Sequence, residues 1–115
     1  MSVEFLMDAG SARYTVVFVT TGSEEEAAGI GGQLVNEGLA ACVNVLPGLV
    51  SIFTWKGAVE QDKECLMIIK SRVELLDKLI QRIKALHSYD VPEVIALPII
   101  GGNRSYLDWI DDVTG

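Results

Sequence analysis

The chain has 115 residues, a length that fits one domain and is too short for two ordinary ones. Its formal net charge is −7, from 9 Lys and Arg against 16 Asp and Glu. Nucleic acid and anionic membranes are therefore poor partners, because binding to them depends on positive charge, whereas metal cations or a basic patch on a protein suit this chain. Apolar residues counted with glycine make up roughly 57% of the sequence, against about 45–50% in ordinary globular chains, and this surplus favours an interface between subunits.

The sequence shows no sign of a membrane segment or of secretion. No stretch approaches the roughly 20 consecutive apolar residues of a membrane span. Residues 1–13 lack the positive segment and apolar block of a secretion signal, and we expect them to form a loose leader before a single domain at 14–115. Cys42 and Cys65 are too few for a disulfide framework, although one bridge between them stays open as an alternative. These features favour a cytoplasmic protein with reduced thiols.

The first predicted elements are a strand and a helix. Residues 14–21 are β-branched or aromatic throughout, which is typical of a well-buried strand. Ser23 and Glu26 have the spacing of a capping box, in which the serine hydroxyl accepts from the Glu26 N–H and the glutamate reaches back. Apolar residues follow at helical spacing. Gly38 predicts the end of this helix, because glycine readily adopts the left-handed conformation.

Residues 39–71 predict a long antiparallel hairpin. One arm runs from 40 to 56 and is interrupted at Pro47 and Gly48, the tip lies at Gly57, and the other arm returns over 59–70. Proline cannot donate to a strand ladder, so Pro47 indicates a bulge, a bend or a sheet edge. Both arms exceed the usual strand length of about 5–6 residues, so their outer halves should project beyond the sheet. Projecting strands are hazardous unless a neighbouring subunit pairs with them, which is a second indication of an oligomer.

A second helix follows the hairpin. Ser71 and Glu74 repeat the capping signature, and leucines and isoleucines recur at helical spacing as far as Leu86. The pattern predicts an amphipathic helix that ends near His87. The two predicted caps occupy matching places in the two halves of the chain.

The last predicted elements are a strand and a short helix. Pro92 prevents continuation of the preceding helix, and residues 93–100 predict a strand that Pro98 places partly at a sheet edge. Asn103 then caps a helix that runs to about residue 113. The order β-α-β-β-α-β-α indicates an α+β fold of the ferredoxin-like split β-α-β kind, with one antiparallel sheet.

Three residues carry the soft donor atoms of a metal site. His87 is the only histidine, and Cys42 and Cys65 are distant from it and from each other, so the close spacings of a structural zinc site are absent. Copper is less demanding, because thiolate suits Cu(I) and imidazole suits Cu(II). Burial as a small hydrophobic residue is the simpler interpretation of each cysteine. The simpler interpretation of His87 is an interaction with a helix C-terminus.

The sequence contains only weak patterns for catalysis, phosphate binding or a hard-cation site. A thiol nucleophile paired with His87 lacks an identifiable orienting group, so we expect no enzyme. Gly29, Gly31 and Gly32 fall inside a predicted helix, where close packing explains them better than phosphate binding does. Two acidic groups could hold a hard cation, but a solvated face is the simpler interpretation of both. These groups are Glu60, Asp62 and Glu64, and Asp108, Asp111 and Asp112.

Several aromatic side chains flank predicted turns. For each one alone, packing is the simpler interpretation. Together with Lys70, His87 and Glu93 they could line a cleft between subunits. The aromatic residues are Tyr89, Tyr106 and Trp109.

Several blocks of the sequence, in order, resemble the CutA family of divalent-cation tolerance proteins. The blocks are 37–44 (EGLAACVN), 47–48 (PG), 51–57 (SIFTWKG), 64–71 (ECLMIIKS), 87–93 (HSYDVPE), 98–99 (PI) and 106–109 (YLDW). They span most of residues 14–110. Two positions depart from the usual family pattern: Ser88 stands in place of proline, and Ser71 stands in place of threonine.

The resemblance implies a ferredoxin-like homotrimer, similar to the PII signalling proteins, in which long strands complete neighbouring sheets. It also implies tolerance of copper and other divalent cations, with Cys42 and His87 as the leading metal ligands. An inter-subunit cleft is implied at the matching positions, which are Glu64, Lys70, Tyr89, Glu93, Tyr106 and Trp109.

Two functions therefore stay open. The first is a non-enzymatic, trimeric protein that binds copper or another divalent metal ion and takes part in the response to metal ions. The second is a PII-like signalling or scaffold module that binds a small ligand or a partner protein in the cleft. Analogy of fold alone is a weak argument for the second.

Overall fold

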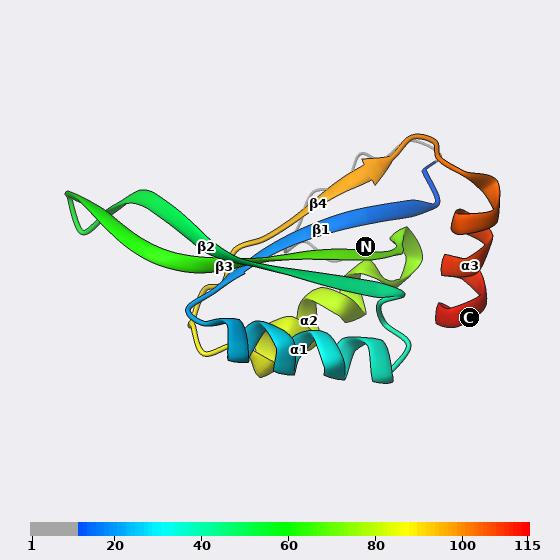
Figure 1. The fold of residues 1–115 in the computed structure, drawn as a ribbon, viewed down its shortest axis with the longest axis horizontal. Helices are drawn as coiled ribbons and strands as arrows, with labels where there is room; N and C mark the ends of the chain where they lie inside the picture. Colours follow the sequence, from blue (N-terminus) through cyan, green and yellow to red (C-terminus); the bar gives the residue numbers. More distant parts are fainter. Residues whose placement is uncertain (1–11) are drawn as a thin grey trace.

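The computed structural model describes residues 12–115 and shows a four-stranded antiparallel sheet with three α-helices (Figure 1). The elements are β1 (Tyr14–Thr21), α1 (Glu24–Asn36), β2 (Cys42–Trp55), β3 (Ala58–Arg72), α2 (Leu76–Leu86), β4 (Val94–Ile99) and α3 (Arg104–Thr114). The strand order is β2-β3-β1-β4. The helices α1 and α2 cover one face of the sheet, and α3 lies at one end of it (Figure 1). The predicted α+β ferredoxin-like fold is confirmed.

The main core lies between the sheet and the helices α1 and α2. Val17 and Val19 of β1 and Met67 and Ile69 of β3 are fully buried there, with Leu34 of α1. Alternate residues of each strand point to the opposite face, as the two-residue period of a strand requires. This second face, which α1 and α2 do not cover, is called the open face below. It carries Val16 and Phe18 of β1, Cys42, Asn44 and Leu46 of β2, Leu66, Ile68 and Lys70 of β3, and Ile95 and Leu97 of β4.

Local signals set both ends of α1. The Ser23 hydroxyl accepts from the Glu26 N–H at 3.1 Å, as predicted. The Glu26 carboxylate accepts from the Ser88 N–H at 2.8 Å, so it tethers the segment after α2. Gly38 has φ of 72°, which confirms its left-handed conformation at the helix end. Gly31 packs closely on the sheet, since a Cβ there would lie 3.0 Å from a Val43 methyl carbon.

The second predicted helix cap is wrong. Ser71 lies inside β3, opposite Thr15, and is fully buried. Its hydroxyl donates to the Leu39 carbonyl at 2.7 Å and is therefore not free to cap a helix. A short 3-10 turn at Val73–Leu75 leads into α2, and no side chain caps it. The strand ladder with β1 continues through Arg72, and this pairing outweighs the local capping pattern.

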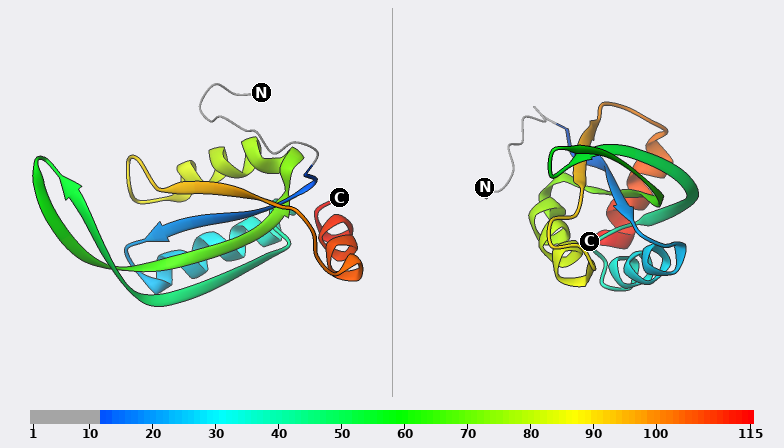
Figure 2. Two further views of the ribbon diagram at one scale, coloured as in Figure 1. Left: turned by 90° about the horizontal axis from the view of Figure 1, so that it is seen from above. Right: turned by 90° about the vertical axis from the view of Figure 1, so that its left-hand side faces the viewer.

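The hairpin of β2 and β3 projects beyond the rest of the sheet, as the sequence predicts (Figure 2). Residues 65–72 of β3 pair with β1 as well as β2, whereas residues 58–64 pair within the described chain with β2 alone. The register shifts between Leu46 and Leu49, so the structure has a bulge at Pro47, one of the three alternatives predicted there. Gly57 lies in the tip with φ of 81°. The molecule is consequently elongated, with extents of 44 × 29 × 25 Å.

The ends of the domain are held by specific contacts. The Asn103 side chain accepts from the Ser105 N–H at 3.0 Å and caps α3, as predicted. β4 pairs with β1 on one side only, so Pro98 lies on an edge strand. Residues 1–11 of the predicted leader lie outside the described residues. Arg13, at its end, is tied down, because its carbonyl accepts from the Val73 N–H at 2.8 Å. Over residues 12–115, no helix has the length and apolar character needed to cross a membrane.

Candidate functional site

Cys42 lies on the open face at the start of β2, opposite Lys70 of β3. The Lys70 ammonium donates to the Cys42 Sγ at 3.9 Å and also to the Asn44 side-chain oxygen. Both cysteines are free thiols, but Cys65 is buried and Cys42 is partly exposed. The packing interpretation therefore fits Cys65 and leaves Cys42 as a thiol that solvent can reach.

Tyr106 of α3 lies beside this thiol, and Trp109 packs next to Tyr106. Burial raises the pKa of Tyr106, and the charge and hydrogen bond of the Cys42 thiol raise it further. The rings of Tyr106 and Trp109 are 5.5 Å apart, and the two residues are exposed, at 43% and 40%. Cys42, Asn44, Lys70 and Tyr106 are called the Cys42 cluster below.

His87 lies at the other end of the sheet and is buried. Its Nδ1 accepts from the Tyr89 N–H at 3.0 Å, so Nε2 carries the ring proton and donates to the Thr20 carbonyl at 2.8 Å. Both ring nitrogens therefore hold hydrogen bonds within the protein. A metal ion could bind the imidazole only after one of these bonds breaks.

His87 and Tyr89 lie close to the carboxylates of Glu26 and Glu64. These four residues are called the His87 cluster below. The Tyr89 hydroxyl donates to Glu64 at 3.0 Å, and burial together with this carboxylate raises the pKa of Tyr89 to about 12. The Glu26 carboxylate lies 3.8 Å from the His87 Nδ1. Burial alone would raise the pKa of Glu26, but the hydrogen bond from Ser88 and the nearby imidazole lower it overall.

The predicted cleft residues fall into two separate groups within one chain. On β3, Lys70 lies opposite Cys42, whereas Glu64 lies opposite no residue of β1. The two residues are six positions apart, or about 20 Å along an extended strand. The structure therefore does not bring Cys42 and His87 together in one protomer. Glu93 is exposed immediately before β4. Residues 12–115 contain no group of three or more His, Cys, Asp or Glu side chains able to hold a metal ion.

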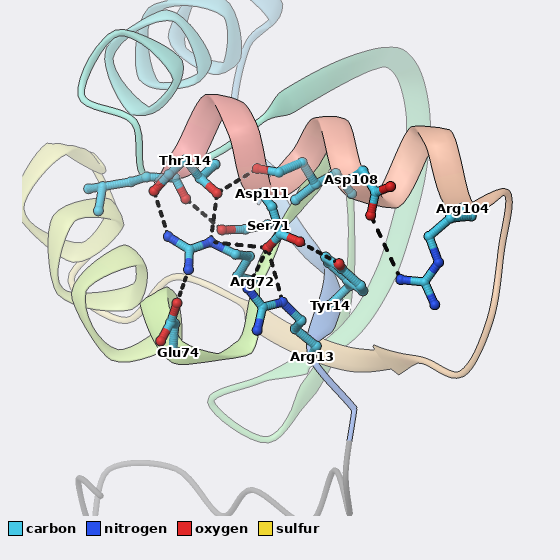
Figure 3. A network of polar contacts seen from close by, with 11 residues as sticks. Arg13, Tyr14, Ser71, Arg72, Glu74, Arg104, Asp108, Asp111 and Thr114 are labelled. Atoms are coloured by element: carbon cyan, nitrogen blue, oxygen red, sulfur yellow. Dashed lines mark hydrogen bonds and ion pairs between the residues drawn. The ribbon is translucent and has the colours of Figure 1, made fainter.

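A polar network lies at the Cys42 end of the sheet (Figure 3). This network was not predicted from the sequence. Arg72, at the end of β3, donates from Nε to the Thr114 hydroxyl at 2.8 Å and from Nη2 to the Thr114 carbonyl at 2.6 Å. It also forms an ion pair with Glu74. Arg72 therefore binds the C-terminal end of α3, where a cation is favourable because the helix dipole is negative.

Asp111 of α3 is the acidic centre of the same network. Its carboxylate accepts from the Tyr14 hydroxyl at 2.6 Å and from the Arg13 Nε at 3.0 Å, and it lies 3.9 Å from the Arg72 Nε. These hydrogen bonds lower the pKa of Asp111. The solvated-face interpretation is thus wrong for Asp111. Acidic residues near a helix C-terminus are unfavourable without a partner, and this was the one signal in the sequence.

The protein's three tyrosines should all ionise above the ordinary value of about 10. The Asp111 hydrogen bond raises the pKa of Tyr14, burial raises the pKa of Tyr106, and Tyr89 reaches about 12. Because the folded values are raised, the stability gained from the neutral phenols is complete below pH about 10 and is lost as the pH rises through the folded values. Phenolate absorbance during an alkaline titration measures this directly.

The control for this titration is the same protein unfolded in urea, which should titrate near the ordinary value. Tyr89→Phe should remove the last component, the one near pH 12. A folded protein that titrates together with the unfolded one would contradict the hydrogen bonds assigned to Tyr14 and Tyr89.

Comparison with known proteins gives consistent matches. The family model described as "CutA1 divalent ion tolerance protein" matches residues 15–113. A divalent-cation tolerance protein CutA of Thermus thermophilus is 53% identical over 100 residues, covering 87% of this chain and 97% of that protein. A chloroplastic CutA 1 of Oryza sativa is 52% identical over 99 residues, covering 86% of this chain but 56% of that protein. The chain thus spans little more than half of the plant relative.

Solved structures agree with these sequence matches. The Thermus thermophilus Cut A1 structure superimposes with a TM-score of 0.87 at 52% identity, covering 89% of this chain and 99% of the other. A protein described as a periplasmic divalent cation tolerance protein CutA, from Archaeoglobus fulgidus, gives a TM-score of 0.87 at 39% identity, with coverage of 89% and 99%. On these matches, the chain belongs to the CutA1 divalent ion tolerance protein family.

Proposed function

We propose that this protein is a homotrimeric divalent-cation tolerance protein that binds copper or another divalent metal ion in clefts between its subunits. In this proposal it takes part in the response to metal ions without enzyme activity, and it works in the cytoplasm, where its two free thiols stay reduced. The observation that carries the metal role is the partly exposed Cys42 thiol, a soft donor on the open face.

The open face supports the assembly. Leu46, Ile95 and Leu97 are 41–52% exposed on that face, although aliphatic side chains of this size are usually buried. The outer half of the β2–β3 hairpin is a ribbon of two strands with further exposed residues such as Ile52 and Val59. A two-stranded ribbon is marginally stable by itself, so pairing with another copy would stabilise it. Both features favour a second and third copy of this chain as the covering partner.

The distribution of donor atoms supports a site between subunits. One protomer offers the Cys42 thiol and the Asn44 oxygen beside the Lys70 ammonium, whose charge opposes a cation. This is an incomplete set for copper, and a neighbouring protomer would have to supply the other ligands. His87 is the second candidate ligand, and its use requires release of the Tyr89 or Thr20 hydrogen bond. When bound, copper would supply a soft, redox-active cation held mainly by thiolate.

Native mass spectrometry of the reduced protein, with and without stoichiometric copper and without oxygen, tests both parts. We expect a trimer that takes up copper, and we expect Cys42→Ser to weaken uptake at least about tenfold, because the thiolate is the strongest donor. His87→Ala tests the second ligand. The matched control is Cys65→Ser, which removes the buried thiol and should leave uptake unchanged. Unchanged uptake in the Cys42→Ser, His87→Ala double variant would refute the site.

The signalling alternative is supported by the two exposed aromatic side chains of α3. Tyr106 lies next to Cys42, which the Lys70 ammonium contacts, and Trp109 packs beside Tyr106. Aromatic rings and a cation in one area suit an organic anion better than a metal cation. A trimer that stays metal-free in the same spectra would therefore favour a small ligand or a partner protein in the cleft.

A further inference from the structure

The helix α3 lies over the same end of the open face that carries the Cys42 thiol. Lys70 pairs directly with Cys42, and Arg72 is two residues further along β3, so all three side chains point to one face. Arg72 contacts the C-terminal end of α3, and Tyr106 near its N-terminal end lies against Cys42. The helix thus starts beside the thiol and ends at Arg72.

Few apolar contacts hold α3 in this place. Leu107 and Ile110 are its buried hydrophobic residues, and they pack with Tyr14 and Ala41, with Ile99 alongside. Ala41 directly precedes Cys42 in the chain, so this small cluster adjoins the thiol. It is separate from the main core, which contains twelve buried residues and none from α3. An element with so small an apolar contact can open by itself, without unfolding of the rest.

Charged contacts make up the remainder of the docking. Arg72 is 10% exposed and Asp111 is 25% exposed at the side chain, so both charges are largely removed from water. Arg72 holds the last turn of α3 through Thr114, and Asp111 holds the helix to Arg13 and Tyr14. Charge-assisted hydrogen bonds of this kind are stronger than neutral ones. Loss of the Asp111 charge should therefore shift α3 toward the undocked state.

We propose that Arg72 and Asp111 are positioning residues that dock α3 over Cys42, and that this docking limits access to the thiol. The docked helix is a partial lid beside the partly exposed Cys42 thiol, and its undocking exposes Cys42 further, together with Ala41 and Tyr14. This inference rests on the proposed function for the role of the thiol, which is metal binding. The access itself does not depend on metal binding.

The test is the rate at which a bulky PEG-maleimide labels each cysteine of the metal-free, full-length protein, followed by gel shift and peptide mass spectrometry. Asp111→Asn should speed labelling of Cys42 about tenfold, because the labelling rate follows the local opening equilibrium. Asp111→Glu, which restores the charge, should return the rate toward that of the unmodified protein. Arg13→Gln, a milder change at a side chain 61% exposed, should give a smaller increase in the same direction.

Two controls separate lid opening from general loss of structure. Cys65 is 5% exposed in the main core and reports global unfolding within the same molecule. Asp108→Asn also removes a carboxylate from α3. Within the described residues this carboxylate pairs only with Arg104 of the same helix. The substitution should leave the labelling rates of Cys42 and Cys65 unchanged.

Faster labelling of Cys42 with Cys65 still protected, and with the oligomeric state unchanged in light scattering, supports the lid. Equal acceleration of both cysteines, or no change at Cys42 in Asp111→Asn and Arg13→Gln, overturns it. Failure of copper uptake in the mass spectra would refute the metal role and leave these labelling rates as they are, so the two proposals fail separately.

Discussion

Replacement of Leu97 by glutamate is expected to convert the trimer proposed above into monomers. Leu97 lies on β4 opposite Val16, on the open face, and is 41% exposed in the single chain. If other copies cover this face, the new carboxylate has no partner, and burying an unpaired charge costs several kcal/mol per subunit. Three such sites in one trimer should exceed the free energy of association. Light scattering and sedimentation velocity at micromolar concentration measure the result.

The matched control for this change is Val35→Glu. Val35 is 43% exposed, close to the value for Leu97, but it belongs to α1, on the opposite side of the sheet. We expect this variant to keep the oligomeric state of the unmodified protein. The open-face assembly is refuted if Leu97→Glu stays assembled, or if the unmodified protein is itself a monomer.

Replacement of Arg72 by methionine is expected to lower the free energy of unfolding by about 2–4 kcal/mol. Methionine keeps much of the apolar stem but leaves the Thr114 hydroxyl and carbonyl without the Arg72 donors, and it removes one of the two cations beside Asp111, the other being Arg13. These groups are partly or fully buried, so water replaces the lost hydrogen bonds poorly. Urea unfolding measures the change, at one fixed protein concentration because association contributes to apparent stability.

Arg104→Met is the control for this substitution. Arg104 also belongs to a charged pair at α3, with Asp108 at 3.8 Å, but its side chain is 78% exposed. Exposed ion pairs contribute little, so this change should stay within about 0.5 kcal/mol of the unmodified protein. Equal effects of the two substitutions would show that the burial of Arg72 contributes nothing to its role.

The parts of the fold that could be predicted are those whose cause is local. Ser23, Gly38 and Asn103 act on backbone groups one to three residues away, and each has the predicted conformation or contact. Pro47 marks the bulge in β2 because proline lacks an N–H whatever surrounds it. The prediction for Ser71 was wrong because non-local contacts decide its position. Ser71 pairs with β1, and its hydroxyl donates to the Leu39 carbonyl instead of capping a helix.

The candidate site was predicted as a set of residue types but not as an arrangement. Cys42 and Cys65 both stand in apolar runs, and the sequence does not distinguish the exposed thiol from the buried one. Pairing register decides this, because Cys42 lies opposite Lys70 on the open face and Cys65 lies opposite Thr21 on the helix side. A shift of one residue in either strand would exchange the two faces.

The sequence by itself determined the element order, the ferredoxin-like class and the family resemblance, because periodicity, capping residues and ordered motifs are properties of neighbouring residues. Only the tertiary structure decided that Cys42 and His87 lie at opposite ends of the sheet, and that Asp111 joins Arg13 and Tyr14, which are 98 and 97 residues away in the chain. A charge finds its partner through distance in space and through removal from water. Neither quantity is present in a linear sequence until the strands have paired and α3 has docked.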